Sequence, residues 1–281
     1  MNNRNTKSGI MLVGIVVFYC LIMAACRDFL AENPNPDSEE LTDLEELQKM
    51  LDHSTQNVDF PNYPLLAADD YYVTSNDYKS GEANDQLMHV WSVTANGDDA
   101  WRAAYRRIFD ANLALEKLGE FGKSSSQTEE VKQIKGSALF LRAYNFFCLA
   151  QTFTDQYSPA TANAVGIPLK INTSTNDIPV AASIRQTYER IIQDCLNAKN
   201  LLSETKVYIS RPSRAAVWAL LSKTYLTIGD YELAGQAADS CLSLYSLLLD
   251  YNHLDSTLAA PFLSRTTAKY CSILFLCLRF S

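Results

Sequence analysis

A short segment with the spacing of a helical hairpin constrains the fold of this chain more than any other feature. Large residues recur in it every three or four positions, small residues stand between them, and a glycine precedes a second helical stretch. Seven positions carry this pattern: Trp218, Leu221, Ser222, Tyr225, Gly229, Tyr231 and Ala234. The large residues of the first half share one helix face, and Gly229 can adopt the positive φ that ends that helix. We therefore expect two paired helices, over roughly residues 213–228 and 231–246.

This order is that of a tetratricopeptide repeat. Two features depart from it, because Ala238 stands where a large aromatic residue is common and no proline ends the second helix. One repeat unit cannot bury its own apolar faces, so further helix pairs must stack on it. Helical spacing predicts such pairs at 101–118 with 128–152, and at 184–203 with 213–228. The predicted fold is mainly α, a tetratricopeptide-like helical repeat scaffold with irregular loop regions.

Single residues within these helices carry structural signals of their own. The predicted helix at 128–152 is apolar on two faces, so we expect it to pack on both sides. Arg142 lies among its apolar residues, where pairing with an internal acid or carbonyl is favoured over holding a ligand carboxylate. Ser183 and Gln186 form a capping box that starts the next helix.

The N-terminus has the organisation of a bacterial lipoprotein signal. Arg4 and Lys7 give it a positive start, residues 9–25 form an apolar run, and small residues precede Cys26. Cleavage before Cys26 would make it the lipidated first residue, although Met23 stands where leucine is usual. The alternative is a membrane-spanning anchor, because the 17 residues of the run approach the lower limit for a span. In either case the rest of the protein lies outside the cytoplasm.

Four segments are predicted along the chain. Residues 1–25 are the signal peptide, and residues 26–40 are a lipid-anchored tether whose prolines cannot continue a helix. Residues 41–260 form the helical domain, and residues 261–281 form an atypical tail. The chain without residues 1–25 has 22 basic and 32 acidic side chains, a net charge of −10. Such a surface repels phosphate backbones, so nucleic-acid binding is disfavoured.

The candidate ligand site lies between residues 57 and 99, where helical periodicity is lost. Prolines, paired acids and aromatic residues predict an irregular loop there, and long loops in compact proteins are often functional. Sugars are gripped by aromatic faces beside fixed polar groups. The candidate contacts are Asp70, Tyr71, Tyr72, Asn76, Asp77, Tyr78 and Trp91. The competing interpretation is that each of these residues packs the loops, whereas Trp101 and Trp218 lie on helical stripes and are expected in the core.

No catalytic, metal or cofactor site is predicted. The acidic pairs Asp69-Asp70 and Asp98-Asp99 could supply glycosidase carboxylates, but adjacent acids rarely converge on one substrate. The three histidines have no metal-ligand spacing, and no glycine-rich phosphate loop or CxxC motif is present. Three cysteines fall within apolar helical patterns, where buried free thiols behave as small hydrophobic residues: Cys148, Cys195 and Cys241.

Several short motifs, taken in order, extend this interpretation. They are Cys26-Arg27-Asp28-Phe29-Leu30, Trp101-x-x-x-Tyr105-x-x-Ile108-x-x-x-Asn112, Ala138-x-x-Leu141-Arg142-Ala143-Tyr144-x-Phe146, Gly166-Ile167-Pro168-Leu169 and the stretch from Ser213 to Tyr231. In this order and spacing, over about residues 26–255, the chain resembles the SusD/RagB family of outer-membrane lipoproteins of Bacteroidota. The resemblance implies a tetratricopeptide-like scaffold facing the cell exterior, lipid-anchored in the outer membrane.

The resemblance also implies a function without catalysis. It implies the binding of a glycan, less often a peptide or other nutrient, and its delivery to a TonB-dependent transporter of the SusC type. Members of the family are considerably longer, and the hydrophobic residues 270–278 do not resemble family sequence, which suggests a truncated or frameshifted product. The alternative function is a protein-interaction scaffold whose helical groove binds peptides or assembly partners.

Overall fold

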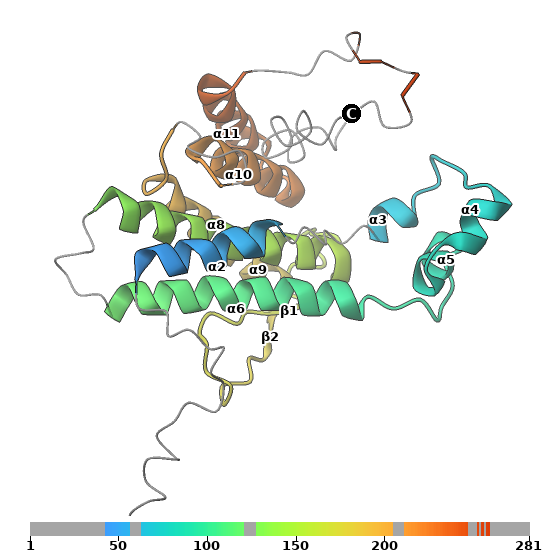
Figure 1. Ribbon diagram of the computed structural model, residues 1–281, viewed down its shortest axis with the longest axis horizontal. Coiled ribbons are helices and arrows are strands. Elements are labelled where there is room, and N and C mark those ends of the chain that lie inside the picture. Colours follow the sequence, from blue (N-terminus) through green and yellow to red (C-terminus); the bar gives the residue numbers. More distant parts are fainter. Residues whose placement is uncertain are drawn as a thin grey trace, which may run out of the picture. The chain divides into compact units, whose positions relative to one another are not determined.

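The structure, a computed structural model, describes residues 43–56, 63–120, 128–204, 211–246, 252, 254–255 and 257–258. In these residues helices predominate, and two short strands form a sheet (Figure 1). The helices are α2 (Leu44–Gln56), α3 (Tyr63–Leu66), α4 (Ser75–Ser80), α5 (Ala83–His89), α6 (Asp98–Glu120), α8 (Glu129–Phe153), α9 (Ile184–Lys199), α10 (Arg214–Ile228) and α11 (Tyr231–Leu244). The strands are β1 (Val165–Pro168) and β2 (Ala181–Ser183). The prediction of a mainly α fold is confirmed.

Helix α8 lies at the centre of the packing. Every residue from Gly136 to Ala150 except Tyr144 is buried, so its whole circumference is covered. It contacts α2, α6, α9, α10 and β1, and Figure 1 shows α2 lying alongside α6 and α8. The predicted packing of this helix on both sides is confirmed. Leu47 and Leu51 attach α2, and full burial of each leucine contributes about 1.5–3 kcal/mol.

Helices α10 and α11 form the hairpin that the repeat pattern predicts. Gly229 has a φ of +83° and ends α10, with its N–H donating to Leu226 O and the Asp230 N–H donating to Tyr225 O. These two bonds satisfy carbonyls that would otherwise be unpaired at the helix end. The Asp230 side chain then accepts from Leu233 N at 3.1 Å and starts α11. The chain therefore reverses within two residues, and the two helices pack against each other.

Helix α9 begins at the predicted capping box. Ser183 Oγ accepts from Gln186 N, and Gln186 Oε1 accepts from Ser183 N. Strand β2 runs directly into this cap and pairs antiparallel with β1, with Val165 opposite Ser183 and Pro168 opposite Ala181. Tyr105 of α6 fixes the sheet by donating its hydroxyl to Pro168 O at 2.7 Å, and burial raises the pKa of Tyr105.

One glycine allows a close approach at the centre of the fold. A Cβ at Gly136 of α8 would lie 2.8 Å from Cγ and 2.9 Å from Cδ2 of Leu202, which follows α9 and is itself buried. Glycine at this position therefore lets the segment between α9 and α10 pack directly on α8.

A buried ion pair ties three helices together. The Arg142 guanidinium of α8 binds both carboxylate oxygens of Asp194 in α9, at 2.7 and 2.8 Å. Its third contact is Asn112 Oδ1 of α6, at 2.9 Å, and Asn112 Nδ2 donates to the carbonyls of Lys170 and Asn172. The prediction that Arg142 is paired internally is confirmed, and the group also holds the loop that follows β1.

The remaining core predictions also hold. Cys148, Cys195 and Cys241 are buried free thiols, and burial raises the pKa of Cys195, with the Asp194 charge as a further cause. Trp101 and Trp218 are half-buried and pack against the main hydrophobic cluster. The expectation of little regular structure between residues 57 and 99 was wrong, because α3, α4 and α5 lie there. Helix α4 begins at a local N-cap, because Thr74 Oγ1 accepts a hydrogen bond from Asp77 N.

Several predicted segments lie outside the described residues. They are the signal peptide at 1–25, the tether at 26–40 with Cys26, and the tail at 261–281. Their boundaries, and that of the 41–260 domain, stay predictions. In the part of the chain that is described, no helix combines the length and the apolar character needed to cross a bilayer.

Candidate ligand-binding site

The predicted site residues gather in one local unit, which we call the aromatic lobe and define as residues 65–97 with the short helices α4 and α5. Its parts are joined by hydrogen bonds from side chains to backbone carbonyls. The Trp91 indole N–H donates to Ala67 O at 2.7 Å, and Tyr71 and His89 both contact Leu66 O, at 3.1 and 3.3 Å. Tyr78 donates its hydroxyl to Gln86 O at 3.3 Å.

Three rings of the aromatic lobe lie next to one another. His89 lies between two tyrosines, with ring centroids 5.6 Å from Tyr71 and 6.1 Å from Tyr78, both tilted. Because Leu66 O can only accept, Nδ1 is the nitrogen of His89 that carries the proton in this contact. The histidine therefore connects α5 to the residues that follow α3.

Trp91 is the most constrained aromatic residue of the lobe. It has a φ of +54°, a left-handed conformation that is unusual for a bulky side chain. Although its N–H is bonded to Ala67, 68% of the residue is exposed. The indole is thus held in one orientation while its surface stays open, as a stacking partner for a ligand requires.

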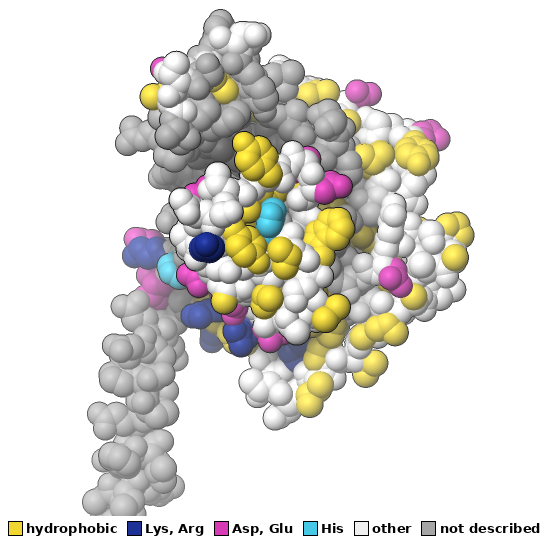
Figure 2. Space-filling model, turned by 90° about the vertical axis from the view of Figure 1, so that its right-hand side faces the viewer, with side chains coloured by type: hydrophobic (Ala, Val, Ile, Leu, Met, Phe, Trp, Pro, Cys, Tyr) yellow, Lys and Arg dark blue, Asp and Glu magenta, His cyan; other side chains and the backbone are white. Residues whose placement is uncertain are grey.

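Tyr72 provides a second exposed ring. It is 87% exposed and adjoins Tyr71, whose ring packs on His89. Figure 2 views the side of the molecule that carries α3–α5 in Figure 1, and it shows hydrophobic side chains gathered around a histidine. An exposed apolar group of this kind is typical of a binding surface.

The predicted polar residues have different positions. Asp70 and Asn76 are exposed in the lobe. Asp77 serves the start of α4, where its Oδ2 accepts from Thr74 Oγ1 at 2.7 Å. Tyr78 is half-buried and packs the interior of the lobe. The structure therefore brings the seven residues into one region and separates the exposed Tyr72 and Trp91 from residues with structural contacts.

His89 was missed as a member of this unit. Its only signal in the sequence was a lone histidine among aromatic residues, which does not identify the two tyrosines whose rings lie next to it. The carbonyls of Leu66 and Ala67 were missed for a simpler reason, since backbone acceptors are the same at every residue.

The two acidic pairs considered for catalysis lie on different segments. Asp69 and Asp70 lie on an exposed turn, whereas Asp98 and Asp99 begin α6, and Asp99 pairs with Arg102. Among the described residues, no three His, Cys, Asp or Glu side chains are grouped as a metal site would require.

Comparison with known proteins explains the helical scaffold. The sequence model of the SusD-like family described as "Starch-binding associating with outer membrane" matches residues 28–226. The chain belongs to this SusD-like family. Its scaffold is therefore that of a carbohydrate-binding family associated with the outer membrane.

Individual relatives agree with this assignment. SusD-like protein P2 of Formosa agariphila is 30% identical over 140 residues, which are 49% of this chain and 25% of the relative. A SusD superfamily structure from Bacteroides thetaiotaomicron matches with a TM-score of 0.63 and 24% identity, over 74% of this chain and 48% of the other. A laminarin-binding SusD-like protein matches with a TM-score of 0.56 and 19% identity, over 70% and 43% of the two chains. These structures share the fold, and the chain spans less than half the length of each of these three relatives.

Proposed function

We propose that this chain binds a glycan at the cell surface, without catalysis, and delivers it to a TonB-dependent SusC-like transporter in the outer membrane. The observation that carries the proposal is the hydrogen-bonded, exposed Trp91 indole, in the same lobe as the exposed Tyr72, on the scaffold of a carbohydrate-binding family. Sugar rings present flat C–H faces, and a preoriented aromatic ring binds such a face without first losing conformational freedom.

The glycan test uses the full chain and calorimetry with starch and laminarin oligosaccharides, which the family description and one structural relative suggest as first probes. We expect Trp91→Ala and Tyr72→Ala each to weaken binding about ten-fold, or about 1.4 kcal/mol. Tyr231→Ala is the matched control, since Tyr231 is 74% exposed but belongs to α11. If all three variants keep the wild-type affinity, the ligand binds elsewhere. Binding of peptides but of no glycan would favour the interaction-scaffold alternative.

We further propose that Cys26 carries the lipid anchor. The apolar run and the small residues before Cys26 support this proposal. Cys26→Ala should abolish lipid labelling and release the protein from membranes, whereas Cys20→Ala should leave both unchanged. Co-purification of the anchored protein with a SusC-like transporter tests delivery, and recovery of the protein alone from membranes would argue against that partner.

A further inference from the structure

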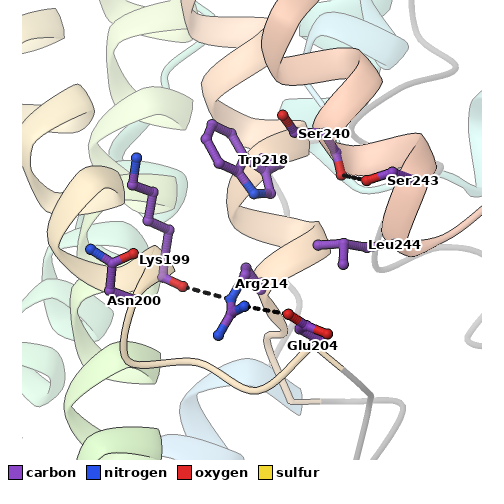
Figure 3. Close-up of a pocket in the computed structure, with 8 residues that line it drawn as sticks. All are labelled: Lys199, Asn200, Glu204, Arg214, Trp218, Ser240, Ser243 and Leu244. Atoms are coloured by element: carbon purple, nitrogen blue, oxygen red, sulfur yellow. Dashed lines mark hydrogen bonds and ion pairs between the residues drawn. The ribbon is translucent and has the colours of Figure 1, made fainter.

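A polar cavity lies where three helices end or begin, away from the aromatic lobe in sequence. It is formed by the C-terminal end of α9, the first half of α10 and the last turns of α11, and its volume is about 370 Å³ (Figure 3). This size is within the usual range for small-molecule sites. One wall of the cavity is formed by Trp218 of the repeat motif and by two cationic side chains, Lys199 and Arg214.

The positive charges of the cavity are only partly compensated. Arg214 donates from Nε to Lys199 O at 2.9 Å and from Nη1 to Glu204 at 2.6 Å, so the Glu204 carboxylate is committed to Arg214. The Lys199 ammonium lies 4.8 Å from the centre of the Trp218 ring, and among the described residues no acidic side chain pairs with it. Within the described part of the chain this cation is thus held over an aromatic ring without a counter-charge, which makes the cavity suited to an anionic group.

The opposite wall is suited to hydroxyl groups. Ser240 and Ser243 of α11 donate their hydroxyl hydrogens to the carbonyls of Gln236 and Ser240, both at 2.8 Å. Their oxygens keep lone pairs that can accept from a ligand, and Asn200 adds an amide with both donors and an acceptor. The cavity therefore offers one positive charge that has no acidic partner among the residues described, beside several neutral hydrogen-bonding groups.

We infer that this cavity binds an acidic sugar residue, a uronic acid whose carboxylate lies on Lys199 and whose hydroxyls contact the serines and Asn200. A neutral sugar fits less well, since the ring of Trp218 is covered by Lys199 on one face and packs against the core. This inference rests on the proposed function, because it assigns a second, charge-selective position to a chain already proposed to bind glycans.

The test uses the full chain and two probes with the same sugar backbone, one with charged carboxylates and one with neutral methyl esters. Calorimetry compares tetragalacturonate with its methyl ester in the wild type and in Lys199→Gln, Lys199→Arg and Lys132→Gln. Lys132 is the matched control, because its side chain is likewise neither buried nor fully exposed but pairs with Glu129 on α8. Thermal unfolding of each variant checks that the fold is retained.

We expect Lys199→Gln to weaken tetragalacturonate binding at least ten-fold, because a charge-assisted contact is lost. Lys199→Arg should bind within about three-fold of wild type, and Lys132→Gln should be unchanged. Raising NaCl from 50 to 500 mM should weaken binding of the acid and not of the ester. Equal binding of acid and ester, or equal affinity in the wild type and Lys199→Gln, would overturn the assignment.

The two proposals fail in different ways. If laminarin binds and depends on Trp91 while tetragalacturonate does not bind, the cavity assignment is wrong and the proposed function stands. If tetragalacturonate binds through Lys199 while no neutral glycan binds, the cavity assignment stands and the aromatic lobe is not a glycan site. Binding of neither probe to the wild type overturns both.

Discussion

Replacement of Arg142 by methionine should strongly destabilise this protein. The guanidinium makes three hydrogen bonds of 2.7–2.9 Å, two to Asp194 and one to Asn112. The Asp194 side chain is 0% exposed, so its carboxylate cannot regain water when Arg142 is removed. Methionine keeps an unbranched apolar side chain along the stem of arginine, and the change therefore mainly removes the charge and its bonds.

The expected loss in the free energy of unfolding depends on how deeply each arginine is buried. Removal of one partner from a buried ion pair costs about 3–5 kcal/mol. For a domain of this size that corresponds to a decrease in Tm of roughly 6–20 °C. Arg190→Met is the matched control, because Arg190 donates to the same Asp194 at 2.8 Å but its side chain is 27% exposed. We expect a loss of about 1 kcal/mol for this control.

Urea unfolding followed by circular dichroism measures both variants. The double variant Arg142→Met with Asp194→Leu should lose at least about 2 kcal/mol less than the sum of its single changes, because the buried carboxylate, which Arg142→Met leaves with Arg190 alone, is removed as well. If Arg142→Met and Arg190→Met differ by less than about 0.5 kcal/mol, burial does not set the strength of this pair, and the reasoning fails.

Two further predictions concern packing and pH. Gly136→Ala should lower the free energy of unfolding by about 1–3 kcal/mol, because a Cβ would collide with the buried Leu202. Gly235→Ala in α11, where a Cβ would meet nothing within 4 Å, should raise it by about 0.5–1 kcal/mol. Urea unfolding measures both variants, and a stability gain at both positions would contradict the close approach at Gly136. Burial raises the pKa of Tyr188 from 10.0 to about 12, a smaller opposing cause being the hydrogen bond from Gln151. The contribution of neutral Tyr188 to the free energy of unfolding is complete below pH 10. It is lost as the pH rises to 12, because the tyrosine of the unfolded chain ionises first, and the loss reaches about 2.7 kcal/mol. Tyr188→Phe should therefore be about 1 kcal/mol less stable than wild type at pH 8 and more stable at pH 11.5, and parallel stability curves over this range would refute the assignment.

Most of the scaffold could be predicted because its signals are local. The capping box at Ser183 and the glycine end at Gly229 lie within a few residues of the bonds that they form. The apolar character of α8 predicted its central position for a similar reason. Arg142 shows where local reasoning stops: an internal partner was expected, but Asp194 lies 52 residues away, and only the packing of α8 on α9 selects it.

The candidate site was predicted as a region and only partly as a set of contacts. Aromatic and polar residues gathered within one stretch of sequence, and the structure keeps them together. Asp77 had a local signal, since threonine three residues before it is a helix-start pattern. The orientation of Trp91 had none, because it depends on a backbone carbonyl 24 residues earlier and on a left-handed backbone that a tryptophan rarely adopts.

The choice of main-chain acceptors in the aromatic lobe has an evolutionary consequence. Trp91, Tyr71 and Tyr78 are secured by oxygens of Ala67, Leu66 and Gln86 that no substitution can remove. Neighbouring outward positions can therefore change without dismantling the attachment points. If the lobe binds a glycan as proposed, a few surface replacements here can alter which carbohydrate is preferred, while the helices of the scaffold remain as they were.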